Sequence, residues 1–289
     1  MKLLLSTNVK DEHNILEWID FHCKLGFTHL LIWDDMSDIP VSTLLSSHLD
    51  KDKDCMVVVE VRREHALKQD YMEQSVAYAK EHGLDFMLHL DGDEYLYLGW
   101  KSQTEPLRIH EYLESVVDSP IMAIYLPWLM MGSNGHVRSP PPGSCLQHYT
   151  RSDSKVHFFI KQLARVSAIS GVRHAHEYIY SLPLSPETCV SSAKQPLTRF
   201  SMNQPSLIPV SKHMPPCIAH FRNQSWDHFR HRRSAHRIRD DTGQPWKYSR
   251  GQLSTDSPIP PPGFLQEATQ ADFPYVLQIY SAMSVFSHI

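Results

Sequence analysis

The stretch HLDGDEYLY, residues 89–97, places three carboxylates inside an apolar run. Asp91, Asp93 and Glu94 follow the apolar segment FMLHL directly. Carboxylates this close repel one another, and each loses hydration beside a core. Asp91 and Asp93 are two residues apart, so in extended chain their side chains share a face. Mg²⁺ or Mn²⁺ prefers such oxygen ligands and keeps coordination positions open for phosphates. A solvated acidic turn is the alternative, but the preceding apolar strand favours the cation.

The elements that must position this cluster alternate between strand and helix over the first hundred residues. Expected strands cover 3–6, 29–33, 56–61 and 86–90, and expected helices lie within 8–26 and 70–83. Asn8 or Asp11 would cap the first helix, and Gly26 suits its left-handed end. Strands that are continuously apolar and separated by helices predict an α/β fold, with a mostly parallel sheet covered on both faces.

Polar side chains follow three of these strands at the end where such sheets bind ligands. The first strand leads into Thr7, Asn8 and Lys10. The second leads into Asp34 and Asp35, and the fourth into the acidic cluster. The sequence therefore predicts one site at the carboxyl edge of the sheet.

The second half of the chain has a different pattern. A strand is expected over 121–128, and an extended segment, with a hairpin as the alternative, over 155–166. The residues after Asn223 favour a helix within a basic, His-rich stretch that reaches Arg239. This stretch is the alternative signal for a nucleic-acid patch. Acidic residues at 227, 240 and 241 dilute it, so no nucleic-acid partner is expected.

The overall composition is that of a soluble globular protein. Hydrophobic residues make up 42% of the 289 residues and charged residues 21%, with a formal net charge of -4. Five cysteines without a CxxC pair argue against a disulfide framework and for a reducing compartment. The opening MKLLLSTNV is too short for a signal peptide, and no run reaches the roughly 20 apolar residues of a membrane span. A cytoplasmic protein without membrane insertion is expected.

Three segments in order resemble glycosyltransferases of the GT-A type, close to family 2 and the family 92-like group. They are NVKDEHNILEWIDFHCKLGFTHLLIWDDMSD at 8–38, HLDGDEYLY at 89–97 and IAHFRNQSWDHF at 218–229. The resemblance is strong over roughly residues 1–100 and weaker to about 230. Trp33, Met36 and Tyr95 are mild departures from the pattern.

The resemblance implies one GT-A domain with a Rossmann-like sheet. Residues 1–100 would bind the nucleotide-sugar and residues 101–253 would form the acceptor side, followed by an extension at 254–289. Thr7, Asn8 and Lys10 would border the base and ribose, together with Asp34 and Asp35. Arg62, or equally Arg63, would meet phosphate or lie solvated at its strand end.

The resemblance also assigns the metal shell and the leaving group. Asp91 would reach ribose and metal, Asp93 would be the closest metal ligand, and Glu94 would orient that shell. His220 would complete the shell unless it is hydrogen-bonded in a packed edge. Arg222 would neutralise the departing diphosphate.

The catalytic base and the acceptor side remain open in the sequence. Glu177 is the first candidate for a base that deprotonates the acceptor hydroxyl, with Asp153 and Glu187 as competitors. Trp128 would line the acceptor side or belong to the core. His174 and His176 resemble a zinc pair, but no third ligand follows at a recognisable spacing.

These expectations define a transferase that moves one sugar from a nucleotide diphosphate donor to a glycan acceptor. The resemblance favours UDP, inversion at the anomeric carbon, and Mn²⁺ or Mg²⁺ as cofactor. A bacterial or large-virus enzyme, acting in the host cytoplasm in the second case, would fit. Two alternatives stay open: a metal-dependent nucleotidyltransferase or phosphatase, and a non-catalytic module that binds nucleic acid or glycan. The sequence does not define the oligomeric state.

Overall fold

The structure, a computed structural model, describes most of the first 234 residues. The described ranges are 1–46, 55–61, 68–102, 105–116, 120–153, 156–157, 159–174, 176–197, 216–222, 224–234 and 271–272. No side chain is described for 231–234 or 271–272. Within these ranges no helix has the length and apolar character needed to cross a membrane.

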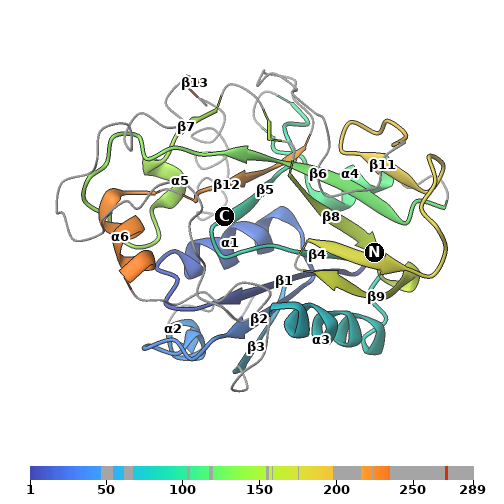
Figure 1. The fold of residues 1–289 in the computed structure, drawn as a ribbon, viewed down its shortest axis with the longest axis horizontal. Helices are drawn as coiled ribbons and strands as arrows, with labels where there is room; N and C mark the ends of the chain where they lie inside the picture. The colour runs from blue at the N-terminus through green and yellow to red at the C-terminus, as the bar shows by residue number, and fades with distance from the viewer. Residues whose placement is uncertain are drawn as a thin grey trace.

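Four parallel strands form the half of the sheet that the sequence predicts (Figure 1). They are β1 (Leu3–Val9), β2 (His29–Asp34), β3 (Met56–Val61) and β4 (Phe86–His89). Their order is β3-β2-β1-β4, and every pairing among them is parallel. The mostly parallel α/β fold is therefore confirmed.

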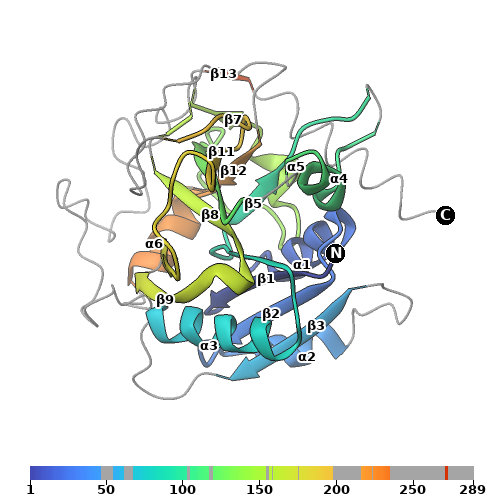
Figure 2. The same ribbon diagram turned by 90° about the vertical axis from the view of Figure 1, so that its right-hand side faces the viewer.

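Alternate residues of these strands feed two cores on opposite faces of the sheet. Leu3 and Leu5 of β1 pack with α1 (Ile15–Leu25), whereas Leu4 packs with α3 (Lys68–Glu81). This alternation follows from the two-residue period of a strand. Figure 2 shows α1 and α3 on different sides of β1 and β2. A continuously apolar strand is thus explained, because helices cover both of its faces.

Strands from the second half of the chain extend the same sheet. The order continues β4-β8-β6-β12-β5, with β11 beside β6, and β8 runs antiparallel to both of its neighbours. The remaining elements of the main sheet are β5 (Glu94–Tyr97), β6 (Ala123–Met130), β8 (Ile160–Arg165), β11 (Cys189–Ser191) and β12 (Cys217–His220).

Short helices and two small ribbons complete the described chain. The helices are α2 (Val41–Ser46), α4 (Ile109–Glu114), α5 (Cys145–His148), η1 (Val166–Ala168) and α6 (Trp226–Ser234). The ribbons pair β9 (Ile169–His174) with β10 (Glu177–Tyr180), and β7 (Arg151–Ser152) with β13 (Ala271–Asp272). The extended chain expected within 155–166 is confirmed by β8, but the hairpin alternative is wrong, because β8 pairs with β4 and β6.

Helix α1 begins later than expected, because β1 continues to Val9. Asn14, not Asn8 or Asp11, stands at the N-cap, and its side chain makes no capping bond to the helix. Gly26 ends the helix at φ 106°, in the left-handed conformation expected of it.

Side chains of α1 tie the helix to the strand that carries the acidic stretch. Trp18 Nε1 donates to the Glu94 carbonyl at 2.7 Å. His22 Nδ1 lies 2.8 Å from the Trp18 carbonyl, and His22 Nε2 accepts from the Leu96 N–H at 3.3 Å. His22 is therefore held as the neutral Nδ1–H tautomer, fully buried between helix and strand.

Burial of the neutral His22 ring is expected to make the fold less stable in acid. Burial lowers the pKa of His22 from 6.5 to about 3. Only the unfolded chain binds this proton in that interval, so the stability is present above pH 6.5 and is lost as pH falls. We expect the free energy of unfolding to fall by about 1.4 kcal/mol per pH unit from this residue alone. Urea unfolding of wild type and His22→Gln across this range measures the difference.

His82→Gln is the matched control. His82 Nδ1 also bonds to a carbonyl four residues earlier, that of Tyr78, but the ring is exposed. This variant should keep the wild-type pH slope, and His22→Gln should flatten it. Equal slopes for His22→Gln and wild type would contradict the assignment.

Candidate active site

The acidic cluster, Asp91, Asp93 and Glu94, lies at the carboxyl end of β4, between β4 and β5. The Leu90 N–H donates to the Ser6 carbonyl at 3.0 Å, which keeps the chain in register with β1 up to the cluster. Gly92 is required between the two aspartates. A Cβ there would lie 2.9 Å from Val9 Cγ1 and 3.0 Å from Glu12 Cγ, which is closer than packing tolerates.

Two lysines neutralise part of this cluster. Lys68, at the start of α3, forms an ion pair with Asp91. Lys161 on β8 lies 3.1 Å from Glu94 Oε2 and 3.5 Å from Asp91 Oδ2. Lys161 is 1% exposed and Glu94 is 0% exposed, so this pair is removed from water almost completely. These ion pairs offset part of the charge repulsion that the sequence analysis attributed to a bound cation alone.

The lysines and the burial set the ionisation of the cluster. Burial acts to raise the pKa of Asp91, but Lys161 and Lys68 outweigh it and hold that pKa well below its usual value. Burial raises the pKa of Glu94, and the charges of Asp91 and Asp93 add to this rise against Lys161. Burial would lower the pKa of Lys161, yet Asp91 and Glu94 raise it above its usual value. Asp91 and Lys161 are therefore charged at neutral pH.

Asp93 lies next to His220, as β5 pairs with β12. Glu94 is opposite His220 in the antiparallel register, and the Phe221 N–H donates to the Asp93 carbonyl at 2.8 Å. His220 Nε2 stands 3.7 Å from Asp93 Oδ1. Both side chains are buried, with 8% and 3% exposed. The strand pairing thus brings together two groups that lie far apart in the sequence.

Aromatic and imidazole rings cover this pair. The Trp128 ring centroid is 4.5 Å from that of His220 and 5.5 Å from that of His176. Lys161 Nζ lies 5.9 Å from the Trp128 ring, within the range of a cation–π contact. Burial, with Lys161 and Lys68 nearby, lowers the pKa of His176 well below its usual value, so this imidazole is neutral.

The ends of β1 and β2 supply further polar groups. Thr7 Oγ1 and Asn8 Oδ1 are buried atoms without a hydrogen-bond partner. Lys10 Nζ donates to the carbonyls of Asp35 and Met36, at 3.0 and 3.2 Å. These groups lie where parallel strands of such a sheet present a ligand site.

Asp34 is committed to the loop that follows β2. Its Oδ1 accepts the Ser37 N–H at 2.9 Å, and its Oδ2 accepts the Val41 N–H at 2.8 Å. Its carboxylate therefore holds the start of α2 in this structure. Asp35, one residue later, is partly exposed.

The candidates for the catalytic base lie on the second half of the chain. Glu177 starts β10, forms an ion pair with Arg173 at 2.8 Å, and has its Oε2 atom 3.1 Å from His174 Nε2. It directly follows His176, whose ring contacts Trp128, and Trp128 in turn contacts His220. The Asp153 N–H donates to the Met130 carbonyl at 2.9 Å. The competitor Glu187 is exposed, and the Ser185 hydroxyl donates to its carboxylate at 2.5 Å.

Two donor-side candidates have less structural description. Arg62 and Arg63 lie outside the described residues. Arg222 lies two residues beyond His220, at the end of β12, and is half-buried.

The described residues supply two of the ligands that a divalent cation would need. Asp93 provides a carboxylate oxygen, which suits Mn²⁺ or Mg²⁺, and His220 places an imidazole nitrogen at the adjacent position. No group of three or more His, Cys, Asp or Glu placed to hold a metal occurs in the described part of the chain. This includes the His174 and His176 pair.

Sequence reasoning missed both lysines of the site. Lys161 interrupts the apolar run FFIKQLA, and a single lysine inside a strand buried on both faces needs a carboxylate partner. The sequence thus indicated that Lys161 pairs with a carboxylate. It did not indicate which carboxylate, because the Lys161–Glu94 contact depends on the order of the strands in the sheet. Lys68 carries no comparable signal.

No family model matches the sequence, and no curated protein matches it significantly. Among solved structures, the chain is similar to residues 1–349 of TarS from S. aureus, with 13% identity and a TM-score of 0.37 over 58% of this chain and 48% of that one. A second similar structure is the mannosyltransferase PcManGT from Pyrobaculum calidifontis in complex with GDP-Man and Mn²⁺. It has 12% identity and a TM-score of 0.34, over 43% of this chain and 35% of that one.

Glucosyl-3-phosphoglycerate synthase from Mycobacterium tuberculosis, with Mn²⁺, UDP-glucose and phosphoglyceric acid, is a third similar structure. It gives 15% identity and a TM-score of 0.30, over 44% of this chain and 43% of that one. This chain spans less than half the length of each of these three structures. The similarities do not assign the chain to a family.

Proposed function

We propose that the protein is a glycosyltransferase that moves one sugar from a nucleotide diphosphate donor to a glycan acceptor. The observation that carries this proposal is the buried acidic cluster at the carboxyl end of β4, with Asp93 beside His220. The polar ends of β1 and β2 share the same edge of the sheet. The GT-A sequence pattern, which places the same segments in the same roles, supports it. We also propose a cytoplasmic location.

In this proposal the nucleotide lies over the ends of β1 and β2. Thr7 and Asn8 would contact base and ribose through the buried oxygens that lack partners. Lys10, Asp34 and Asp35 would border the same subsite, and Arg62 or Arg222 would meet the diphosphate. UDP is the proposed nucleotide, on the strength of the sequence resemblance.

A divalent metal, when bound, would neutralise the diphosphate and so stabilise it as a leaving group. Asp93 and His220 would hold the ion, and Asp91, anchored by two lysines, would face the ribose. Glu94 would orient this shell through its bond from the Asp91 N–H, at 2.8 Å. The protein thus holds the cluster in shape before the donor arrives, as preorganised catalysis requires.

Transfer with inversion is the proposed outcome. A carboxylate, Glu177 or Asp153, would take the proton of the acceptor hydroxyl as its oxygen forms a bond to the anomeric carbon. The bond from that carbon to the diphosphate would break at the same time, on the opposite face. Release of Glu177 from Arg173 and His174 would precede this step. Trp128 would form part of the acceptor side.

Nucleotide release from a panel of UDP-, GDP-, TDP- and CMP-sugars tests the proposal. The purified full chain is incubated with each donor in Mn²⁺, Mg²⁺ or EDTA. We expect slow hydrolysis of one donor, lost in EDTA, because the metal offsets the charge of the leaving group. Thermal shift with the same nucleotides is the second readout. A nucleotide present at 100 times its Kd should stabilise the fold by about 2.7 kcal/mol.

Each outcome separates the transferase from its rivals. Release of free nucleotide diphosphate, or of CMP from a CMP-sugar, identifies sugar transfer to water. Release of phosphate, or of nucleotide monophosphate from a UDP-, GDP- or TDP-sugar, identifies phosphatase or nucleotidyltransferase chemistry. No release and no thermal shift from any nucleotide would overturn the enzyme and favour the binding module.

A further inference from the structure

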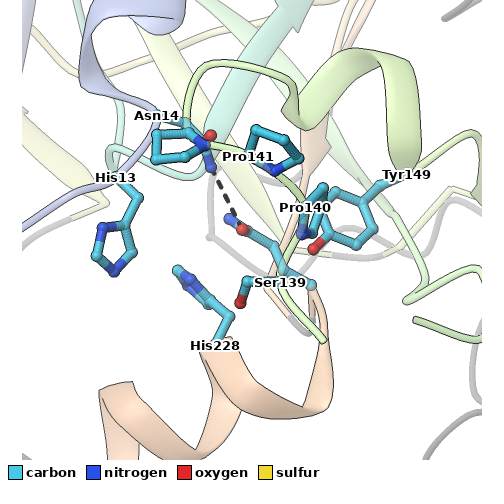
Figure 3. Close-up of a pocket in the computed structure, with 9 residues that line it drawn as sticks. His13, Asn14, Ser139, Pro140, Pro141, Tyr149 and His228 are labelled. Carbon is cyan, nitrogen blue, oxygen red and sulfur yellow. Dashed lines mark hydrogen bonds between the residues drawn. The ribbon is translucent and has the colours of Figure 1, made fainter. Parts of the chain in front are cut away.

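A cavity lies between the start of α1, the loop before α5 and the start of α6. Its volume is about 150 Å³, about that of an engineered cavity that holds one six-membered ring. His13 and Asn14 line one side, a run of prolines at 140–142 lines another, and Gln224 and His228 come from the segment that leads into α6. Figure 3 shows the rings of His13 and His228 near one another beside the cavity. Their centroids lie 6.0 Å apart in a T-shaped arrangement.

A chain of hydrogen bonds fixes one polar group in this cavity. Asn14 Oδ1 accepts the Gly143 N–H at 3.0 Å, which sets the orientation of the Asn14 amide. Asn14 Nδ2 must then donate, and it donates to Gln224 Oε1 at 3.3 Å (Figure 3). Gln224 Nε2 is left as a buried N–H donor without a partner. Gln224 is only 3% exposed, so this donor needs an oxygen atom in the cavity, from a ligand or from a water that a ligand hydroxyl can replace.

The lining selects a neutral ligand. None of the described lining residues is Asp, Glu, Lys or Arg, so the cavity offers no permanent charge to a phosphate or a carboxylate. Prolines supply flat apolar walls, and Tyr149 adds a ring whose buried hydroxyl also lacks a hydrogen-bond partner. Apolar walls with a few placed polar groups suit a compact ligand that has both C–H faces and hydroxyl groups. A sugar ring has this combination, and a nucleotide diphosphate does not.

The cavity lies within reach of the acidic cluster. Glu12, which precedes His13, packs against Gly92 of the Asp-Gly-Asp turn. Gln224 follows His220 by four residues, which limits the separation of their Cα atoms to about 14 Å. A glycan with one ring in the cavity can therefore extend toward the transferred sugar.

We propose that this cavity binds one neutral sugar ring of the acceptor, with Gln224 Nε2 donating to a ring or hydroxyl oxygen. The statement that the bound sugar belongs to the acceptor rests on the proposed function. The statement that the cavity binds a sugar ring rests only on the residues that line it.

Saturation-transfer NMR on the full chain, with millimolar methyl glycosides of common hexoses, N-acetylhexosamines, deoxyhexoses and pentoses, tests it. We expect a saturation-transfer signal, which reports binding, from at least one glycoside. Gln224→Met keeps the volume but removes the donor, and should weaken that binding roughly fivefold to tenfold. Gln195→Met is the matched control at an exposed position and should bind as wild type.

A second variant tests the cavity without touching the amide chain. His13 is exposed, so His13→Trp should fold normally and obstruct the opening. It should weaken glycoside binding while leaving the thermal shift by UDP unchanged. The proposal would be overturned if no glycoside gave a saturation-transfer signal. It would also be overturned if the signal kept its wild-type strength in both Gln224→Met and His13→Trp.

Donor hydrolysis measured on the same samples separates this proposal from the proposed function. Glycoside binding weakened in Gln224→Met, without hydrolysis of any donor and without thermal shift from any nucleotide, would support the carbohydrate site and overturn the transferase. Hydrolysis of a donor, without glycoside binding at Gln224, would do the reverse.

Discussion

Asp93→Asn is expected to abolish turnover while the protein still folds. Asparagine keeps the shape of the side chain but removes the charge that faces His220 at 3.7 Å. Loss of groups that merely support a metal site already lowers activity about 10–100-fold, so a direct ligand should lower it by more. Stability should change by less than about 1 kcal/mol, because the substitution also relieves repulsion among three carboxylates. Donor hydrolysis and thermal unfolding measure the two effects.

Asp85→Asn provides the same chemical change away from the site. Asp85 is exposed and its carboxylate accepts the Lys2 N–H at 2.7 Å. This control should keep the wild-type rate. If Asp93→Asn also keeps it, the role of Asp93 as metal ligand is wrong. If Asp93→Asn unfolds, a structural role would account for the loss, and Mn²⁺ titration of the folded fraction would have to show weakened binding to retain the assignment.

The sheet was predictable because its signals are local. Strands β1 to β4 announce themselves as continuous apolar runs, and the helices between them leave a parallel arrangement as the simplest solution. Even the site edge follows, because all parallel strands end on the same side. The hairpin at 155–166 failed for the opposite reason. Whether β8 pairs with its own neighbour or with β4 depends on partners far away in the chain.

The detailed contacts of the site were not predictable, because each joins segments that only the tertiary fold brings together. The pattern E-W-x-x-F-H indicates a helix, but not that Trp18 and His22 would bond the strand after the cluster. Nor does it indicate that Glu17 would accept the N–H groups of Cys145 and Leu146, at 2.9 and 3.2 Å. These polar side chains inside an amphipathic helix are the signal that could have been used.

Lys161→Met is expected to be the most destabilising single change near the site. It removes the buried cation that lies within 3.5 Å of two carboxylates and leaves their charge uncompensated. Breaking a buried pair in this way costs about 3–5 kcal/mol. For a chain of this size, that corresponds to a fall in Tm of roughly 6 to 20 °C. Lys101→Met is the matched control, because Lys101 pairs with Glu105 and Glu111 at the surface, and should leave Tm unchanged.

The pH dependence and a double variant identify the cause of the loss. Lys161→Met removes the charge that opposes the effect of burial, so the pKa of Glu94 in the folded state rises further. The folded state then binds a proton at pH values where Glu94 in the unfolded chain has already lost it. The loss of stability in Lys161→Met should therefore be smaller at about pH 5 than at about pH 8. The first pH is close to the ordinary pKa of a glutamate carboxyl group, and the second is well above it. Lys161→Met with Glu94→Gln removes the stranded charge yet keeps the acceptor for the Asp91 N–H, so it should regain part of the lost stability. A double variant no more stable than Lys161→Met, at either pH, would show that Lys161 stabilises by packing against Trp128 rather than by charge.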